Sequence, residues 1–195
     1  MTITPAEPVA VAQQTFRTLL TAMARPGTVH ELVSRPGESP EEAVAFALVD
    51  HEVAFAVIGG QQTAGAASVA RRITLRTGSS EAETSDAAFV FVYAPLTATI
   101  WASVRRGTLE YPDGGATVVY VLSSVGAGPL VLTLTGPGIE TEQRLALAGL
   151  PASEFALRDE ACGDYPMGVD CMFVDSEGHV ACVPRSSKIA QIEEG

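Results

Sequence analysis

Apolar segments without a polar face are the feature that most restricts the fold of this chain. Residues 87–93 form one such segment, and residues 169–174 form a second that carries a single acid, Asp170. A strand of this kind has no side to turn toward water, so both faces of its sheet must be covered. Helical patterns elsewhere in the chain can supply that cover. We therefore predict a layered α/β fold whose mixed sheet includes some antiparallel pairs.

Apolar residues at helical spacing predict a first helix over residues 9–24. Arg25, Pro26 and Gly27 end it, because proline disfavours helix in the residue before it and glycine accepts the turn. Ser39 suits the N-cap of a second helix. Residues 1–8 are expected to be a loose tail. The same patterns predict further helices at residues 61–72, 97–106, 140–147 and 151–161. They predict strands at residues 52–58, 73–75, 117–123 and 130–135, with a turn at 126–129 between the last two.

Length and composition predict a single domain over residues 1–195. Of the 195 residues, 47% are hydrophobic, which is enough for one substantial core. The chain shows no apolar run of membrane-spanning length and no signal-peptide pattern, so we expect a soluble, cytoplasmic protein without a membrane partner. The formal net charge of -11 disfavours attraction to phosphate backbones, so nucleic acid is not an expected partner.

The end of the chain is typical of a β-hairpin, with apolar segments on both sides of turn residues 175–178. If Glu177 and Gly178 form a two-residue turn, the register places Asp170 opposite Arg185. Cross-strand partners lie close enough for a charge-assisted contact, so we predict a salt bridge between them. An ordinary pair at a strand edge, contributing about 0–1 kcal/mol to stability, is the alternative to a functional role.

The residues after this hairpin are the first candidate site. Arg185, Ser186, Ser187 and Lys188 follow one another where the second strand ends. Cationic and hydroxyl groups of this kind suit an anion or the carboxylate of a partner.

The cysteines and histidines do not predict a metal site. Cys162, Cys171 and Cys182 lack the spacing of a zinc ligand pair, and the histidines include no i, i+4 pair. In the two-residue register, Cys171 and Cys182 share one face with Phe173, as small core residues would. We expect reduced, buried thiols.

Other candidate residues each have a simpler alternative. Gly136 and Gly138 follow a predicted strand, where backbone N–H groups can hold an anion, but Pro137 removes one donor and a plain tight turn is the alternative. Arg25 adds a basic edge at the end of the first helix, with a solvated arginine as its alternative. The acidic and histidine residues 50–52 are expected to be a charge cluster at a helix end.

Together, three motifs resemble those of the PhnH family. They are F-R-x-L-L-x-A-M-A-R-P-G at residues 16–27, L-T-G-P-G-I at 134–139, and Y-P-x-G-V-D at 165–170 with P-R-S-S at 184–187. They occur in the expected order along almost the whole chain. The family commonly has two threonines where this chain has two serines, so the hydroxyls are kept.

The resemblance implies a subunit of the bacterial carbon–phosphorus lyase core complex. In that pathway PhnG, PhnH, PhnI and PhnL are associated with replacing the adenine of ATP by an alkylphosphonate, which gives a ribose 1-phosphonate 5-triphosphate such as ribose 1-methylphosphonate 5-triphosphate. PhnJ later cleaves the carbon–phosphorus bond. The family forms homodimers and joins PhnG, PhnI and PhnJ, so these are the expected partners.

The resemblance also implies a three-layer α/β/α sandwich similar to the large domain of pyridoxal-phosphate-dependent transferases. We expect no cofactor. Pyridoxal phosphate in particular needs a lysine for its Schiff base, and the only lysine, Lys188, lies near the end of the chain. Two functions remain open. The protein is a subunit without catalytic groups of its own, or it is an enzyme domain in which Arg25, Asp170 and Arg185 grip a phosphonate or triphosphate at the dimer interface.

Overall fold

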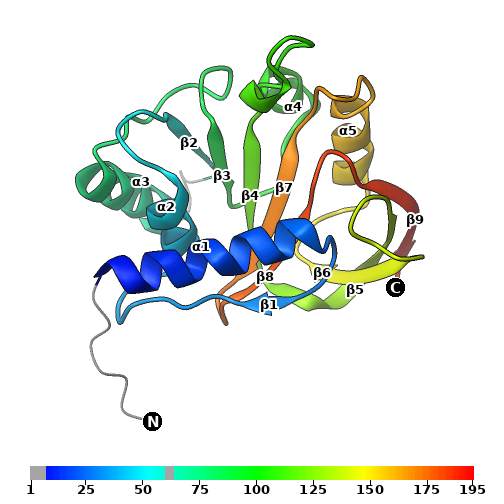
Figure 1. The fold of residues 1–195 in the computed structure, drawn as a ribbon, viewed down its shortest axis with the longest axis horizontal. Helices are drawn as coiled ribbons and strands as arrows, with labels where there is room; N and C mark the ends of the chain where they lie inside the picture. The colour runs from blue at the N-terminus through cyan, green and yellow to red at the C-terminus, as the bar shows by residue number, and fades with distance from the viewer. Residues whose placement is uncertain (1–7, 60–63) are drawn as a thin grey trace.

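The computed structural model describes residues 8–59 and 64–195, and its centre is a six-stranded mixed sheet (Figure 1). The strands lie in the order β1-β8-β7-β4-β3-β2. Neighbouring strands are parallel in the larger part of the sheet, which consists of β2 (Phe55–Ile58), β3 (Phe89–Val92), β4 (Thr117–Leu122) and β7 (Asp170–Asp175). The sheet continues beyond β7 through antiparallel pairs with β8 (His179–Val183) and β1 (His30–Glu31). The predicted α/β fold with a mixed sheet is confirmed.

Both faces of the central strands are buried, as their sequences require. In β3, Val90 and Val92 point into one core and Phe91 points into the other. β7 divides in the same way, with Phe173 in the first core and Met172 in the second. Because side chains alternate along a strand, each of these strands contributes to both cores.

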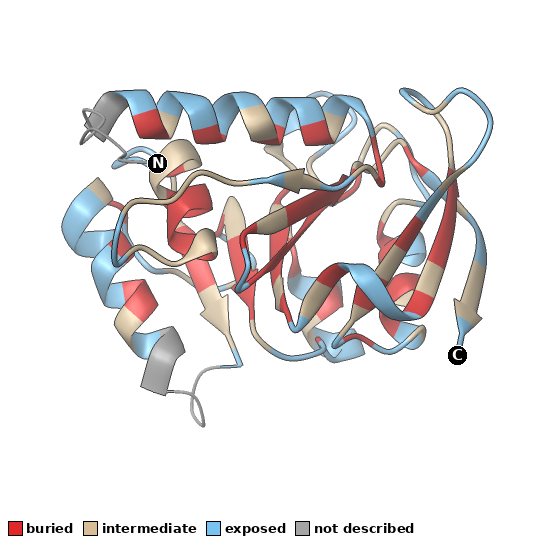
Figure 2. Ribbon diagram, turned by 90° about the horizontal axis from the view of Figure 1, so that it is seen from below, coloured by how far each residue is buried: buried red, intermediate tan, exposed pale blue. Residues whose placement is uncertain are grey.

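Helices cover one face of the sheet: α1 (Pro8–Ala24), α2 (Pro40–Leu48) and α3 (Ala64–Thr77). The buried residues of α1 lie on its side toward the sheet (Figure 2). Ala22 of α1 packs in one core with Val44 of α2 and Ile73 of α3. The predicted cap of α2 is present, because the Glu42 carboxylate accepts a hydrogen bond from the backbone N–H of Ser39 at 2.9 Å.

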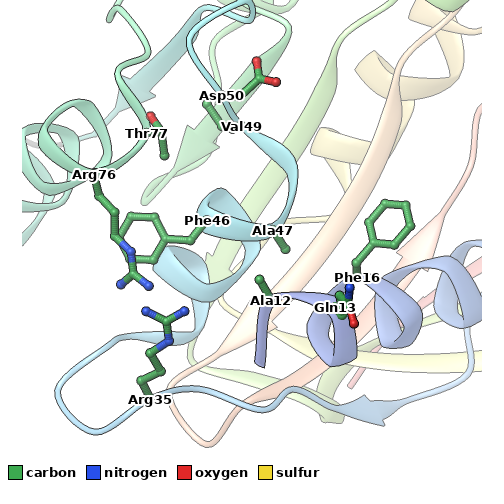
Figure 3. A pocket seen from close by; sticks show the side chains of 10 residues that line it. All are labelled: Ala12, Gln13, Phe16, Arg35, Phe46, Ala47, Val49, Asp50, Arg76 and Thr77. Carbon is green, nitrogen blue, oxygen red and sulfur yellow. The ribbon is translucent and has the colours of Figure 1, made fainter. Parts of the chain in front are cut away.

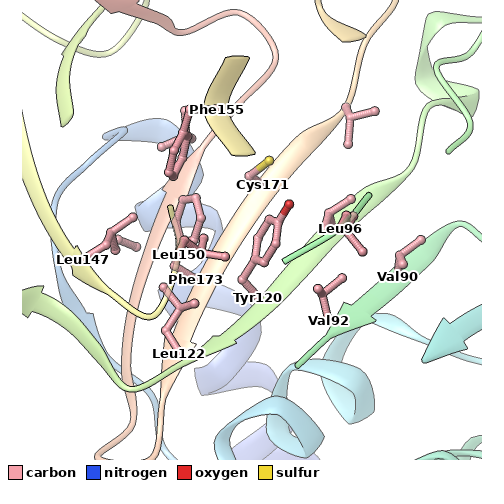
Figure 4. Close-up of a cluster of buried hydrophobic side chains, with 14 of the residues drawn as sticks. Val90, Val92, Leu96, Tyr120, Leu122, Leu147, Leu150, Phe155, Cys171 and Phe173 are labelled. Atoms are coloured by element: carbon pink, nitrogen blue, oxygen red, sulfur yellow. The ribbon is translucent and has the colours of Figure 1, made fainter. Parts of the chain in front are cut away.

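A second, smaller sheet covers the opposite face together with short helices, so the predicted all-helical third layer is found only in part. The antiparallel sheet has the order β6-β5-β9, with β6 (Gln143–Ala148), β5 (Ser124–Thr135) and β9 (Lys188–Glu194), and the helices are α4 (Ala98–Ser103) and α5 (Ser153–Ala161). Figure 4 shows the core beneath this layer. The Tyr120 and Phe173 rings stack with their centroids 5.6 Å apart, and the Phe155 centroid lies 5.9 Å from that of Phe173.

Several predicted elements are wrong. Residues 140–147 do not form a helix, because Leu145 and Leu147 alternate with less buried neighbours and pair in β6. Residues 73–75 belong to α3 and not to a strand, since the helix continues to Thr77. Residues 126–129 do not join two paired strands but form an irregularity within β5, whose partner strands are β6 and β9 and not β4. The strand β9 was not predicted.

Parts of two other predictions lie outside the described residues. Pro8 is the first residue of α1, and the rest of the predicted tail at 1–8 is not described. Residues 61–63 of the predicted third helix are likewise outside the description. Among the helices that are described, none combines the length and hydrophobicity needed to cross a membrane.

The terminal hairpin is present, but its register differs by one residue from the prediction. Val174 pairs with Val180, so Ser176, Glu177 and Gly178 form a turn of three residues rather than two. The Asp175 side chain explains the longer turn, because its Oδ1 accepts the backbone N–H groups of Glu177 and His179 at 3.0 Å each.

The register changes the position of one cysteine. Cys182 pairs with Met172 and lies in the core under the helical layer, whereas Cys171 lies with Phe173 in the core under the small sheet. The prediction that both cysteines share a face is therefore wrong, because a shift by one residue moves a side chain to the other face of the sheet.

Candidate functional site

Asp170 and Arg185 form the predicted salt bridge, although the register that led to the prediction is wrong. The distance between Arg185 Nη2 and Asp170 Oδ2 is 2.6 Å. The backbone N–H of Arg185 also donates to Asp170 Oδ1 at 2.8 Å. In the observed register the residue facing Asp170 is Pro184, which lies beyond the end of β8. The chain therefore leaves the strand at Pro184 and turns Arg185 back onto the carboxylate.

Every nitrogen of the Arg185 guanidinium has a partner within the protein. Nε and Nη2 donate to Asp170, and Nη1 donates to the carbonyl oxygen of Pro112 at 2.5 Å. A Cβ atom on Gly115 would lie 2.6 Å from Nη1 and 2.4 Å from the carbonyl oxygen of Gly168, so the packing around this group requires glycine there. This geometry favours a structural role for the pair, which holds the loop after β8 against β7 and the residues before β4.

A second arginine, Arg158, holds the same loop from the other side and was not singled out from the sequence. Its side chain is only 2% exposed. Nη1 donates to the carbonyl oxygen of Ser187 at 2.9 Å and to Asp159 Oδ1 at 2.8 Å, and Nη2 donates to the carbonyl oxygen of Pro184 at 2.5 Å. The signal in the sequence is its position three residues after Phe155, on the buried face of α5.

The two glycines of the middle motif serve close packing. A Cβ atom on Gly138, whose φ is +84°, would lie 2.3 Å from the carbonyl oxygen of Ala24 at the end of α1. A Cβ atom on Gly136 would lie 3.0 Å from the carbonyl oxygen of Ser186. The carbonyl of Gly136 also accepts the N–H of Ile139 at 3.2 Å, which is the bond of a tight turn. The geometry therefore favours the plain turn over an anion cradle.

The same contacts bring together the three motifs that lie far apart in the sequence. The glycine turn at 136–138 lies between the end of α1 and the segment Ser186–Ser187. Arg25 is exposed at the end of α1 and is not among the residues that bond Asp170 or line the cavity described next. The structure thus brings Asp170, Arg185 and the two serines to one place and leaves Arg25 at its edge.

A cavity of about 740 Å³ opens beside the loop that Arg158 and Arg185 hold. One wall comes from α5 and the turn after it, and the other comes from the loop and the start of β9. The lining residues are Pro137, Arg158, Asp159, Cys162, Gly163, Tyr165, Arg185, Ser186, Ser187, Lys188 and Ile189. Basic side chains outnumber the single carboxylate of Asp159, in a protein whose formal net charge is -11.

In the described part of the chain, no hydrogen bond joins a hydroxyl or thiol group of the cavity to a carboxylate or an imidazole. Cys162 is its only thiol, and the Sγ atom donates to the carbonyl oxygen of Val169 at 3.5 Å. Burial raises the pKa of the neighbouring thiol of Cys171 to about 12, so this group stays protonated at neutral pH. Within residues 8–59 and 64–195, no three His, Cys, Asp or Glu side chains gather as metal ligands would. The basic and hydroxyl groups along the cavity are suited to binding an anion.

One turn before Arg158 on α5, Glu154 is a buried carboxylate that is 3% exposed. Its oxygens accept hydrogen bonds from the backbone N–H of Leu96 at 3.1 Å, from Trp101 Nε1 at 2.9 Å and from the Tyr120 hydroxyl at 2.6 Å. Burial raises the pKa of Tyr120 well above its ordinary value, so the hydroxyl remains a donor at neutral pH. This network ties α5 to α4 and β4.

A second cavity, of about 530 Å³, lies between α1 and α2 (Figure 3). The Arg76 guanidinium lies 4.0 Å from the centroid of the Phe46 ring, and its Nη1 is 3.0 Å from Glu38 Oε1. Asp50 lines this cavity too, and its Oδ1 accepts the backbone N–H of Glu52 at 2.9 Å. Residues 50–52 are exposed and follow the end of α2, where the charge cluster was predicted. The arginine is engaged by a carboxylate and a ring, so the region serves packing of the helical layer.

Comparison with known proteins identifies the family. The family model described as "Bacterial phosphonate metabolism protein (PhnH)" matches residues 5–190. A "Putative C-P lyase subunit protein HtxG" of Stutzerimonas stutzeri is 39% identical over 182 residues, which cover 92% of this chain and 87% of the relative. The "Alpha-D-ribose 1-methylphosphonate 5-triphosphate synthase subunit PhnH" of Rhizobium meliloti (strain 1021) is 30% identical over 191 residues, which cover 94% of this chain and 92% of the relative. The chain therefore belongs to the PhnH family of bacterial phosphonate metabolism proteins.

Proposed function

We propose that this protein is a subunit of a carbon–phosphorus lyase core complex, without catalytic groups of its own, that supports the formation of ribose 1-methylphosphonate 5-triphosphate from ATP and an alkylphosphonate. The observation that carries the proposal is the family match over residues 5–190, together with two relatives that are both named as subunits. The bonding of the candidate site agrees with it, because within the described residues no hydroxyl or thiol group there bonds a carboxylate or an imidazole.

Exposed apolar side chains support a role in an assembly. Leu109 and Tyr111, two residues apart in the loop after α4, are 74% and 64% exposed. Large apolar groups that adjoin one another on a surface are typical of residues that a partner covers, whereas single ones are common on any protein. We propose a homodimer, with subunits of the PhnG, PhnI and PhnJ type as further partners, in the cytoplasm.

The proposed subunit has no pyridoxal phosphate, even though its fold is proposed to be similar to the large domain of pyridoxal-phosphate-dependent transferases. Lys188 is exposed at the first position of β9, at the edge of the small sheet. A Schiff-base lysine has to be directed into an enclosed cofactor site. Borohydride trapping with pyridoxal phosphate is expected to give no stoichiometric adduct at Lys188, and such an adduct would contradict the proposal.

The alternative is an enzyme domain that grips a phosphonate or triphosphate with Arg25, Asp170 and Arg185. The bonding of Arg185 weighs against it, since each guanidinium nitrogen already has a partner in the same chain. A carboxylate at the centre of the group would also repel an anionic substrate.

Co-expression with tagged PhnG, PhnI and PhnJ tests the proposal. We expect the chain to co-purify with them in fixed ratio, and the isolated chain to be a dimer by light scattering that releases no adenine from ATP. Adenine release by the pure chain, abolished by Arg185→Ala, would replace the subunit function with the enzyme function.

A further inference from the structure

We infer that the cavity beside Ser186 and Lys188 binds an organic phosphate or phosphonate within a single protomer, with the phosphorus oxyanion at the loop and the organic group toward Tyr165. The inference rests on the proposed function only for the chemical class of the ligand. The position of the site rests on the donors, charges and walls of the cavity.

The donors at the loop are available. Within the described residues, no carboxylate lies within 4.0 Å of the Lys188 ammonium group, and no hydrogen bond engages the Ser186 hydroxyl. The Ser187 hydroxyl and Arg158 Nε, from two further residues of this wall, are shielded from solvent and lack a hydrogen-bond partner in the same part of the chain. Buried donors without partners are costly, and a native protein has few of them. The donors that a ligand can reach on this wall are therefore the Lys188 ammonium group and the Ser186 hydroxyl, beside an interior whose donors are not fully satisfied.

The charges favour an anion. Asp170 and Asp159 engage Arg185 and Arg158, so each of these arginines is paired, whereas Lys188 is not. The remaining positive charge lies in a concave site of a protein with a formal net charge of -11. A concave wall of one sign concentrates ligands of the opposite sign.

The loop is held before any ligand arrives. Arg158 bonds the carbonyl oxygens of Pro184 and Ser187, and Asp170 bonds both the main chain and the side chain of Arg185. The backbone that carries the Ser186 hydroxyl therefore loses little freedom on binding, which favours affinity.

The shape and donor number select the ligand class. A phosphonate or phosphate presents three oxygens to a group of hydroxyl and ammonium donors, whereas a carboxylate presents two. The volume of about 740 Å³ is larger than an inorganic ion requires and lies in the range of sites for small organic ligands. Tyr165 and Ile189 provide apolar surface for the organic group.

Isothermal titration calorimetry on the full chain at low salt tests the inference with ribose 5-phosphate, methylphosphonate, acetate and ribose as probes. We expect ribose 5-phosphate to bind more tightly than methylphosphonate, and acetate and ribose to show no binding at millimolar concentration. Lys188→Gln should weaken both phosphorus ligands about tenfold or more, which corresponds to about 1.4 kcal/mol. Tyr165→Ala should weaken ribose 5-phosphate and leave methylphosphonate unchanged, because only the larger ligand has a group that reaches the tyrosine.

Arg144→Gln is the matched control, since Arg144 is a cation of the same small sheet that pairs with Glu193 and does not line the cavity. It should change the dissociation constants less than twofold. Absence of binding, equal loss in Arg144→Gln and Lys188→Gln, or acetate binding as tight as methylphosphonate would each overturn the inference.

The two proposals fail separately. A wild-type chain that joins the PhnG, PhnI and PhnJ subunits but binds neither phosphorus ligand contradicts the cavity inference and leaves the proposed function in place. A chain that binds these ligands but does not co-purify with the subunits contradicts the proposed function and leaves the cavity inference in place.

Discussion

Glu154 and Arg158 lie one turn apart on α5, are almost equally buried, and are bonded in opposite ways. Glu154 accepts hydrogen bonds from a backbone N–H, an indole and a hydroxyl in the interior. Arg158 donates to carbonyl oxygens of the loop after β8 and keeps one nitrogen, Nε, without a partner in the described residues. A fully bonded buried charge stabilises one arrangement of the elements around it. Arg158 instead fixes the backbone of the loop that carries Ser186 and Lys188 along the cavity.

Replacing Glu154 should cause the largest loss of stability. In Glu154→Ala the N–H of Leu96, the indole of Trp101 and the hydroxyl of Tyr120 all lose their acceptor, so we expect a loss of roughly 3–5 kcal/mol in the free energy of unfolding. Urea unfolding followed by the fluorescence of Trp101, the only tryptophan, measures it. Glu154→Gln keeps one acceptor oxygen and should lose less. A loss below about 1 kcal/mol in Glu154→Ala would mean that the network is not needed for the fold.

Replacing Arg158 should affect binding as well as stability. Arg158→Met keeps much of the side-chain volume but leaves the carbonyl oxygens of Pro184 and Ser187 without their donor, so we expect a loss of roughly 2–3 kcal/mol. The dissociation constant for ribose 5-phosphate should also rise about tenfold, while Glu154→Gln should leave it unchanged. Equal effects of the two variants on binding would remove the distinction between the two charges.

The salt bridge of Asp170 and Arg185 should contribute less than Arg158. The two side chains are 20% and 14% exposed, so the pair is better shielded than one on the surface. Arg185→Ala should cost roughly 2 kcal/mol, more than the 0–1 kcal/mol typical of exposed pairs, because the carboxylate is left without its partner. A double-mutant cycle with Asp170→Ala separates the pair from its surroundings. A coupling energy near zero would show that the side-chain pair adds no stability and that the hydrogen bond from the Arg185 backbone N–H to Asp170 alone holds the loop.

The smallest expected effect is a pH dependence from Asp175. Burial alone raises the pKa of this carboxyl, but hydrogen bonds from the N–H groups of Val125 and His179 and from the His179 ring outweigh it, so the pKa is lowered. A carboxyl with a lowered pKa stabilises the folded state above its unfolded pKa of about 3.9, and this stability is lost as the pH falls through the folded value. Unfolding of the wild type and Asp175→Asn below about pH 4 measures it. The variant should lose less stability on acidification, and parallel curves would show that Asp175 contributes none of the dependence.

The sequence alone was sufficient for elements whose cause is local. The helical period with its stop at Arg25-Pro26-Gly27 predicted α1, and Ser39 as an N-cap predicted the start of α2. The apolar segment at residues 87–93 predicted β3 and its burial on both faces. Each of these signals acts within a few residues of the chain, where spacing and side-chain type decide the outcome.

Tertiary structure decided how these elements combine. The register of the hairpin depends on which backbone groups the Asp175 side chain caps, and that choice moved Cys182 to the other face. The strand β6 resembles a helix in composition and forms because β5 offers a partner for it. The sequence around Arg158 does not distinguish it from other helix residues. Its role depends on the loop after β8, whose carbonyl oxygens accept hydrogen bonds from its guanidinium. Such outcomes depend on contacts between residues far apart in the chain, which short-range patterns do not encode.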